Sequence, residues 1–454
     1  MRWKQLTRMA LVTLTLVALS GTTCSFEENE NYGEMGSLEY RLNWLMRNAE
    51  DNKTYTISLT HDERGGVSLD LDKNITIYLY LKGIGGNRTI SSGFSVYNGV
   101  TLVLDDNITV RGGISLGYDY DYTGYTYTGG NLIMNAGSAV TGGINVYSGG
   151  SFTMNGGIIS GSANGGVYVS EGGTFTMNGG TISGNTNGGV DVYSGGSFTM
   201  NGGTISGNTA SAYVDDSSSY AYGGGVGVHG GTFAMHGGTI RDNTAYVHDS
   251  SSYAYGGGVS VSGGSFTMYG GTIRDNTAYV DDSSSYAYGG GVCVSGGGIF
   301  TMHGGTICGN TAHGSGSSGG SGVCVSAGRS SDMYGGTFTM NGGTISGNTV
   351  TSYSGNAYGG GVYIYYDNNY SYLSYTITFI KTGGTIYGYS ADDTANSNVV
   401  KDFDNAVLND RGHAVYASDD YSYPSSDKRR ETTAGPGVNL YWNDNGTFSG
   451  GWEY

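Results

Sequence analysis

Proline and charged residues are scarce in this chain of 454 residues. It contains 2 prolines, and charged residues make up 13% of it, against about 25% in an average soluble domain. Glycine is abundant, with 86 residues, but there is no Gly-X-Y period, which excludes collagen. Lysine and arginine number 20 against 37 acidic residues, and the net charge of -17 argues against nucleic acid or an anionic membrane surface as a partner.

Long apolar segments are also missing beyond the N-terminus. Three basic residues among the first eight precede an apolar run at residues 9–19, a pattern that predicts a secretory signal peptide over residues 1–24. The run is too short to span a bilayer, and no later stretch of about 18 apolar residues exists. Cys24 follows the run and is a candidate for lipid attachment; in the alternative, cleavage occurs near Ser20 and Cys24 is an ordinary thiol. We therefore expect an exported protein, at the cell surface, at the outer membrane or in the periplasm, with membrane contact only through this possible lipid anchor.

One unit recurs along the chain. The segment GGVYVSEGGTFTMNGGTISGNTN at residues 165–187 is followed directly by a close copy at 188–210, a period of 23. Each unit holds three short stretches of alternating residues separated by glycine-rich corners, which places Val, Phe, Met and Ile on one face. Such units predict an all-β fold, a single right-handed parallel β-helix of about 23 residues per coil over residues 67–391. The marker phenylalanine recurs at Phe152, Phe175, Phe198, Phe233, Phe266, Phe300, Phe338 and, in a diverged copy, Phe379.

Stacking of equivalent residues predicts ladders along the interior of the β-helix. Asparagine tolerates the left-handed backbone of a tight corner, and stacked amides can hydrogen-bond from coil to coil. The expected ladders are Met154, Met177, Met200, Met235, Met268, Met302 and Met340, and Asn185, Asn208, Asn243, Asn276, Asn310 and Asn348.

Two flanking segments complete the predicted body. Residues 25–66 contain a linker and a helix at 37–49 whose apolar stripe suits a lid on the first coil, because an open β-helix end exposes core and strand edges. Residues 392–454 lose the repeat and are expected to form a distal cap. The helical stripe consists of Leu38, Leu42, Leu45, Met46 and Ala49.

The repeat resembles that of a known group of proteins. FTMNGGTISGNTA joined to GGGVYV is similar to the repeat of spirochaete right-handed β-helix surface proteins, and more loosely to that of the chlamydial polymorphic outer-membrane proteins. Outside the repeats, ITIYLYLKGIGGNRTI and RRETTAGPGVNLYW are similar to segments of the spirochaete group. The resemblance implies an exported, adhesin-like repeat protein with no catalytic residues to carry over.

Three nearly identical inserts interrupt successive coils, at residues 213–222, 246–255 and 279–288. Because they leave the same corner of successive coils, we expect a comb of loops on one side of the β-helix. The loops are expected to contribute no core residue and to bind a host or cell-surface glycan or protein. Tyrosine and serine are the residues that binding loops favour, aromatic rings stack on sugar faces, and repetition adds avidity. In the alternative, the inserts are copies of a low-complexity loop without a ligand, and their acids are solvated charges. The candidate binding residues are Tyr213, Tyr220, Tyr222, Tyr246, Tyr253, Tyr255, Tyr279, Tyr286, Tyr288, Asp215, Asp216, Asp281 and Asp282.

Few other residues suggest a catalytic or metal-binding site. Arg241 and Arg274, each followed by an aspartate, predict a surface ion-pair ladder rather than a substrate clamp. The seven histidines lack metal-ligand spacing, so we expect no metal or cofactor. Cys293 and Cys324 occupy equivalent outward positions about 4.8 Å apart, where free thiols are favoured over a disulfide, and Cys308 has no evident partner.

The favoured function is therefore non-enzymatic adhesion or ligand binding. The alternative is a carbohydrate-active β-helix enzyme, a polysaccharide lyase or hydrolase, which requires a cleft with several convergent ionisable groups. A third possibility follows from two parallel files of Ser and Thr hydroxyls on one flat face, as in ice-binding β-helices. Ala234 and Ile299 interrupt these files.

Overall fold

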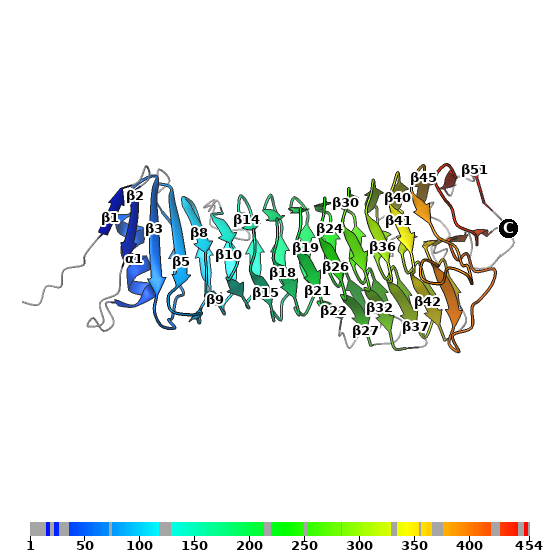
Figure 1. Ribbon diagram of the computed structural model, residues 1–454, viewed down its shortest axis with the longest axis horizontal. Coiled ribbons are helices and arrows are strands. Elements are labelled where there is room, and N and C mark those ends of the chain that lie inside the picture. Colours follow the sequence, from blue (N-terminus) through cyan, green and yellow to red (C-terminus); the bar gives the residue numbers. More distant parts are fainter. Residues whose placement is uncertain are drawn as a thin grey trace, which may run out of the picture.

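The protein forms an elongated all-β solenoid (Figure 1). The computed structural model describes residues 36–71, 75–117, 129–212, 219–248, 252–282, 284–327, 334–353, 356–365, 376–418, 427–443 and 449–452, and the backbone of 15–18 and 22–26. Within these residues there is one helix, α1 (Leu38–Asn48), and it is not long and apolar enough to cross a membrane.

Three long sheets form the body. In one coil, β17 (Thr174–Met177) is followed by β18 (Thr181–Ser183), β19 (Val190–Tyr193) and then β20 (Ser197–Met200), which lies beside β17. We name the sheets by their inward residues, and in the described part of the chain the Phe sheet has 16 strands, the Ile sheet 11 and the Val sheet 13. Neighbouring coils pair in parallel with equivalent residues opposite each other, as in Phe175 with Phe198.

The interior is built from the predicted ladders. From Phe152 to Phe338 the phenylalanine rings stack with centroids 4.6–4.8 Å apart and planes within 5–7° of parallel. The seven ladder methionines are fully buried. Both ladders confirm the inward assignment. The methionine ladder ends at Lys381, which lies opposite Met340. Lys381 is fully buried, at 0% exposure, and its Nζ donates to the carbonyls of Gly435 (2.7 Å) and Val438 (3.1 Å).

The asparagine ladder is also present, and of its two expected causes the hydrogen bonding from coil to coil is confirmed, whereas the left-handed backbone lies elsewhere. Each amide donates from Nδ2 to Oδ1 of the next asparagine at 2.8–3.0 Å, and the side chains are buried. The left-handed residue of the corner is the one before each asparagine, a glycine in most coils and Asp242 (φ +55°) or Asp275 (φ +57°) in two. Asparagine is therefore required for its two-sided hydrogen bonding, and the ladder extends to Asn398, where the repeat can no longer be recognised in the sequence.

Helix α1 packs its apolar side against the first coils. Ser37 is the N-cap and accepts from the backbone N–H of Tyr40 (3.3 Å), while Leu38, Leu42 and Leu45 are fully buried in the main core. Buried Arg41 pairs with Glu63, whose carboxylate also accepts from the backbone N–H of Leu38 (2.5 Å). The charged pair holds the helix start, and the sequence pattern did not reveal it.

Parallel pairing reaches beyond both expected ends of the solenoid. It begins at β2 (Thr22–Phe26), which pairs with β3 (Lys53–Leu59), and β3 pairs in turn with β5 (Ile77–Gly83). Antiparallel β1 (Thr15–Ala18) lies at the edge of the Phe sheet. At the other end, β47 (Val399–Asp402) and β48 (Val415–Ser418) still pair in parallel with the preceding coil. The antiparallel strands beyond them are β49 (Lys428–Arg430), β50 (Leu440–Asn443) and β51 (Ser449–Gly450).

Candidate functional site: the side lobe

The inserts form two additional sheets, which we call the side lobe. It projects from one side of the later coils (Figure 1). The outer lobe sheet consists of β22 (Thr209–Ala212), β27 (Thr244–Val247), β32 (Thr277–Val280), β37 (Thr311–Gly314), β42 (Thr349–Ser352) and β47. The inner lobe sheet consists of β23 (Tyr220–Tyr222), β28 (Tyr253–Tyr255), β33 (Tyr286–Tyr288), β38 (Ser318–Gly319) and β43 (Ala357–Tyr358). The expectation of a comb of loops is thus wrong for the described part of the inserts, while Tyr213, Asp215 and Asp216 lie outside the described residues.

The two lobe sheets share a small core of their own. Thr-Ala-Tyr-Val in the outer sheet and Tyr-Ala-Tyr in the inner sheet alternate, so alanine and valine face inward between the sheets. These side chains are at most 2% exposed, and their small size suits close packing of the two sheets. The inserts therefore do contribute core residues, contrary to the expectation from the sequence. The cluster consists of Ala221, Ala245, Val247, Ala254, Ala278, Val280 and Ala287.

The inner lobe sheet turns its tyrosines toward the Val sheet. Tyr253, Tyr255 and Tyr288 are 3%, 8% and 2% exposed and form one cluster with Cys293, Cys324, Tyr363, Tyr365 and Tyr416. These three candidate binding residues instead hold the side lobe onto the body, and the partly buried Tyr222 and Tyr286 pack against the same cluster. Tyr220, at the edge strand, is 36% exposed.

The stacked cysteines lie beneath this tyrosine layer. Cys293 on β34 (Val292–Ser295) is in register with Cys324 on β39 (Val323–Ser326), and both are free thiols, as expected. They point away from the main core but are fully buried, because the inner lobe sheet covers them. Burial raises the pKa of the Cys324 thiol well above its ordinary value.

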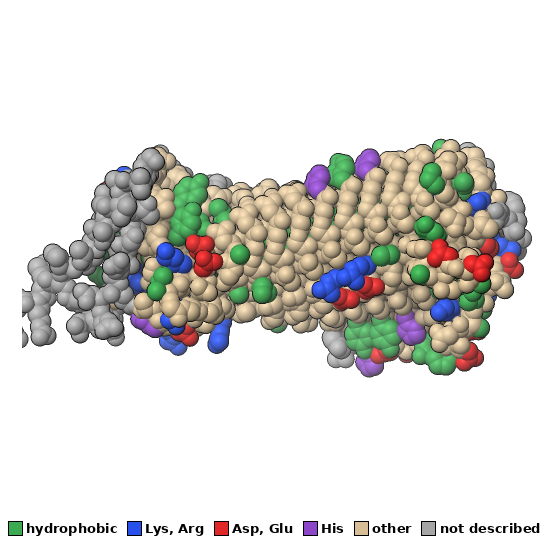
Figure 2. Space-filling model, in the orientation of Figure 1, with side chains coloured by type: hydrophobic (Ala, Val, Ile, Leu, Met, Phe, Trp, Pro, Cys, Tyr) green, Lys and Arg blue, Asp and Glu red, His purple; other side chains and the backbone are tan. Residues whose placement is uncertain are grey.

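A row of rings runs along the outward face of the outer lobe sheet, and we call it the aromatic strip; Tyr246, Tyr279 and His313 in it are partly exposed. Tyr246, Tyr279 and His313 are in register, with centroids 5.5 and 5.4 Å apart and planes within 12° and 7°. Tyr353 and Phe403, which are 50% and 55% exposed, continue the row, their centroids 4.0 Å apart. Figure 2 shows hydrophobic side chains gathered on the protruding edge of this part of the molecule, with histidine beside them.

Asp281 adds a carboxylate to the aromatic strip. Its Oδ2 accepts from the hydroxyl of Tyr246 (2.7 Å) and lies 2.8 Å from Nδ1 of His248. A hydrogen bond from Tyr279, with smaller contributions from Tyr246 and His248, lowers the pKa of Asp281, and the same contact raises the pKa of Tyr279 to about 12. Asp282 accepts from the backbone and hydroxyl of Ser284, which lowers its pKa too. The strip therefore carries fixed negative charge at neutral pH.

The stacking of the rings determines which atoms of the strip a ligand can contact. Parallel rings with centroids near 5.5 Å cover one another's faces, so their edges and hydroxyl groups point outward. Stacking of a sugar on an open ring face, which the sequence suggested for all the tyrosines, is therefore restricted to the ends of the row. Tyr353 and Phe403 are the exposed rings at one end.

The remaining predicted positions do not converge. Arg241 and Arg274 each pair with the aspartate that follows, in half-exposed pairs stacked one coil apart. On another face, His236, Tyr269 and His303 stack with centroids 4.8 and 5.2 Å apart. Among the described residues, no group of three or more His, Cys, Asp or Glu side chains is placed to hold a metal ion.

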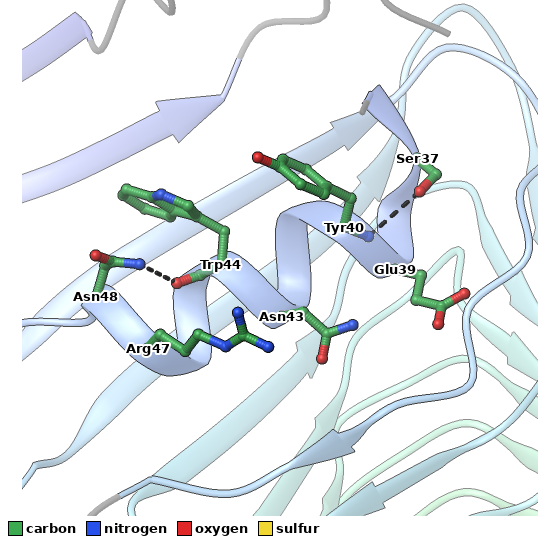
Figure 3. A pocket seen from close by; sticks show the side chains of 7 residues that line it. All are labelled: Ser37, Glu39, Tyr40, Asn43, Trp44, Arg47 and Asn48. Atoms are coloured by element: carbon green, nitrogen blue, oxygen red, sulfur yellow. Dashed lines mark hydrogen bonds between the residues drawn. The ribbon is translucent and has the colours of Figure 1, made fainter. Parts of the chain in front are cut away.

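A separate hollow lies over the solvent side of α1 (Figure 3). Tyr40 and Trp44 point to the same side of the helix, and both are partly exposed. The hollow has a volume of about 380 Å³ and is lined by Ser37, Glu39, Tyr40, Asn43, Trp44, Arg47 and Asn48. It is a feature of a single helix, and we assign it no ligand.

Comparison of the chain with protein-family models, curated proteins and solved structures gave no match. The resemblance to the spirochaete and chlamydial repeats therefore stays a prediction.

Proposed function

We propose that this chain is a non-enzymatic, exported repeat protein that binds a glycan or protein of a host or another cell through its side lobe. The aromatic strip with Asp281 carries the proposal. We further propose that the solenoid is a right-handed β-helix capped by α1 and by the C-terminal antiparallel strands, since uncapped ends would expose strand edges.

The composition of the strip suits recognition of a macromolecule. Exposed apolar patches rimmed by polar groups mark interaction surfaces, and tyrosine offers a large contact area with few rotatable bonds. Because Tyr246 and Tyr279 are on paired strands and bonded to one carboxylate, little side-chain freedom remains to be lost on binding. One ring per coil also repeats the contact along the body, which favours an extended partner.

Export and attachment through Cys24 would display the lobe away from the membrane. Cleavage before Cys24 would remove β1 and the first residues of β2, leaving the rest of the solenoid. If Cys24 carries lipid, the first coils lie nearest the membrane. From β3 to β25 (Thr232–Met235) the Phe sheet advances by seven strand steps, so the aromatic strip, which begins at Tyr246 in the coil of β25, would stand about 34 Å further out at about 4.8 Å per step.

The test is binding by paired tyrosine variants. Purified protein without residues 1–24 is screened against a glycan array and immobilised matrix proteins, and any ligand found is titrated with the double variant Tyr246→Ala/Tyr279→Ala. Loss of two aromatic contacts should weaken binding by about tenfold or more. Tyr269→Ala is the control, because Tyr269 is a stacked tyrosine that is 51% exposed, more than the partly exposed Tyr246 and Tyr279, and lies outside the lobe.

Two outcomes would contradict the proposal. If the double variant keeps its fold by circular dichroism and binds as well as the parent, the strip is not the contact surface. If Tyr269→Ala weakens binding equally, the effect is not specific to the lobe. The test uses point variants rather than deletion of the inserts, because a deletion would also remove the alanine and valine core of the lobe.

A further inference from the structure

A second candidate site lies at the inside corner where the side lobe begins, and we call it the step. The inner lobe sheet starts at β23, in the same coil as β24 (Val226–His229) of the Val sheet. The preceding strands of the Val sheet, β16 (Val167–Val169) and β19, have no described lobe strand over them. Their outward residues Tyr168, Asp191 and Tyr193 form the floor of the step. Tyr222 and His229, in edge-to-face contact with centroids 5.9 Å apart, form its wall.

A missing side chain creates room for two polar groups at the step. Asp191 is in register with Gly227, and a Cβ at position 227 would lie 2.5 Å from Oδ1 of Asp191 and 2.7 Å from Nε2 of His229. The Asp191 carboxylate and the His229 imidazole thus both lie above Gly227, with Oδ1 and Nε2 3.8 Å apart. Their side chains are 20% and 23% exposed. Substitution of Gly227 would displace both groups without removing either.

Aromatic residues neighbour Asp191 in the Val sheet, with Tyr168 opposite it in register and Tyr193 two residues further along its strand. The rings of Tyr168 and Tyr193 lie 4.9 Å apart, and Tyr193 is 4.9 Å from the ring of His229. Tyr193 remains 38% exposed, so the row is open to solvent. Burial raises the pKa of Asp191, with His229 acting in the opposite direction, and burial together with the charge of Asp191 raises the pKa of Tyr193 to about 12.

We propose that the step binds a positively charged amine, either a protonated primary amine or a quaternary ammonium group. A carboxylate attracts a cation, and the attraction grows where neighbouring side chains partly exclude water. Within the described part of the chain, Asp191 pairs with His229, whose Nε2 lies 3.8 Å from Oδ1, and with no lysine or arginine. A ligand amine would supply the missing charge, and the overall charge of -17 would favour its approach.

This site shares no residue with the aromatic strip, so the two proposals can fail separately. The amine could be a lysine side chain of a protein, a choline headgroup or an amino sugar. All three present the same chemistry to Asp191. The side-lobe variants Tyr246→Ala and Tyr279→Ala should leave amine binding at the step unchanged.

The experiment is a titration of the purified protein with choline and with its uncharged carbon isostere, followed by the side-chain NMR signals of the tyrosines. Choline should bind saturably, and the isostere at least about tenfold more weakly, because it lacks the charge. Asp191→Asn keeps the shape of the site and should weaken choline binding by about tenfold. Gly227→Ala should weaken it by crowding. Asp242→Asn, at an exposed aspartate outside the step, should have no effect.

Equal binding of choline and its isostere, absence of choline binding, or full binding by Asp191→Asn would each overturn the proposal. Where choline binds as expected, phosphatidylcholine vesicles, an oligolysine peptide and glucosamine are compared on the parent and on Asp191→Asn. The source of the amine is the one whose binding depends on Asp191. If binding of all three is independent of Asp191, the step takes free choline and none of these three sources.

Discussion

Replacement of Asn243 by alanine should destabilise the solenoid far more than the same change at an exposed asparagine. The side chain of Asn243 is fully buried and makes four hydrogen bonds. Nδ2 donates to the carbonyl of Ile205 (3.0 Å) and to Asn276 Oδ1 (2.9 Å), and Oδ1 accepts from the backbone (3.0 Å) and Nδ2 (2.9 Å) of Asn208. At about 1 kcal/mol each, the loss is about 4 kcal/mol of unfolding free energy.

The chain provides a matched control in a second asparagine ladder on its surface. Asn201 donates to Asn178 Oδ1 at 2.9 Å, the same contact as in the buried ladder, but it is exposed to water. Water can replace the partner there, so Asn201→Ala should cost less than about 1 kcal/mol. Asn243→Asp should be at least as damaging as Asn243→Ala, because carboxylate oxygens would face two acceptors, the Ile205 carbonyl and Asn276 Oδ1.

The assay is urea unfolding followed by circular dichroism, with amide hydrogen exchange to localise the effect. In a stacked array each coil contacts only its neighbours, so loss of protection should be largest at the backbone N–H of Asn208. If Asn243→Ala and Asn201→Ala differ by less than about 1 kcal/mol, the buried amide ladder does not hold the coils together.

Four further predictions follow from the same structure. Phe266→Asp places a charge between two rings 4.6 and 4.7 Å away and should cost about 4 kcal/mol or more in urea unfolding, whereas Thr267→Asp, on the outward face, should be nearly neutral; equal effects would refute the inward assignment. Ala278→Asp should expose the amides of the side lobe to hydrogen exchange while the Phe sheet stays protected, and protection of both would mean that the lobe lacks its own core. His413 accepts from the backbone N–H of Val400, and burial holds its pKa below the ordinary 6.5. The stabilisation that neutral His413 provides should therefore be fully present above pH 6.5 and should be lost as the pH falls below that value. Thermal melts should show a smaller loss of stability at low pH for His413→Asn. Incubation with acidic and neutral polysaccharides, with and without Ca²⁺, should release no reducing ends or unsaturated products, and turnover abolished by one substitution would favour the enzyme alternative.

The sequence alone determined the body of the molecule. With a period of 23 residues and Phe, Met, Ile and Val at fixed places, the apolar side chains are buried when equivalent residues of successive coils stack. Each coil contacts mainly its own copies, so the ladder partners of Phe266 or Asn243 can be read from an alignment of the chain with itself. The stripe of Leu38, Leu42 and Leu45 predicted the helix for the same local reason.

Only the tertiary structure decided what the inserts become. Their alternation of alanine or valine with tyrosine was visible in the sequence, but whether a short alternating stretch pairs depends on neighbours that only the stacked coils supply. Tyr246 faces solvent and Tyr255 is buried, although both belong to one insert, because the outward face of the Val sheet covers the second. Likewise, the step joins Asp191 to Tyr222 and His229 through the loss of one side chain at Gly227 and the onset of the lobe in the next coil. Such a site depends on which strands lie over which face, and this relation is set by contacts between coils rather than by any local pattern of residues.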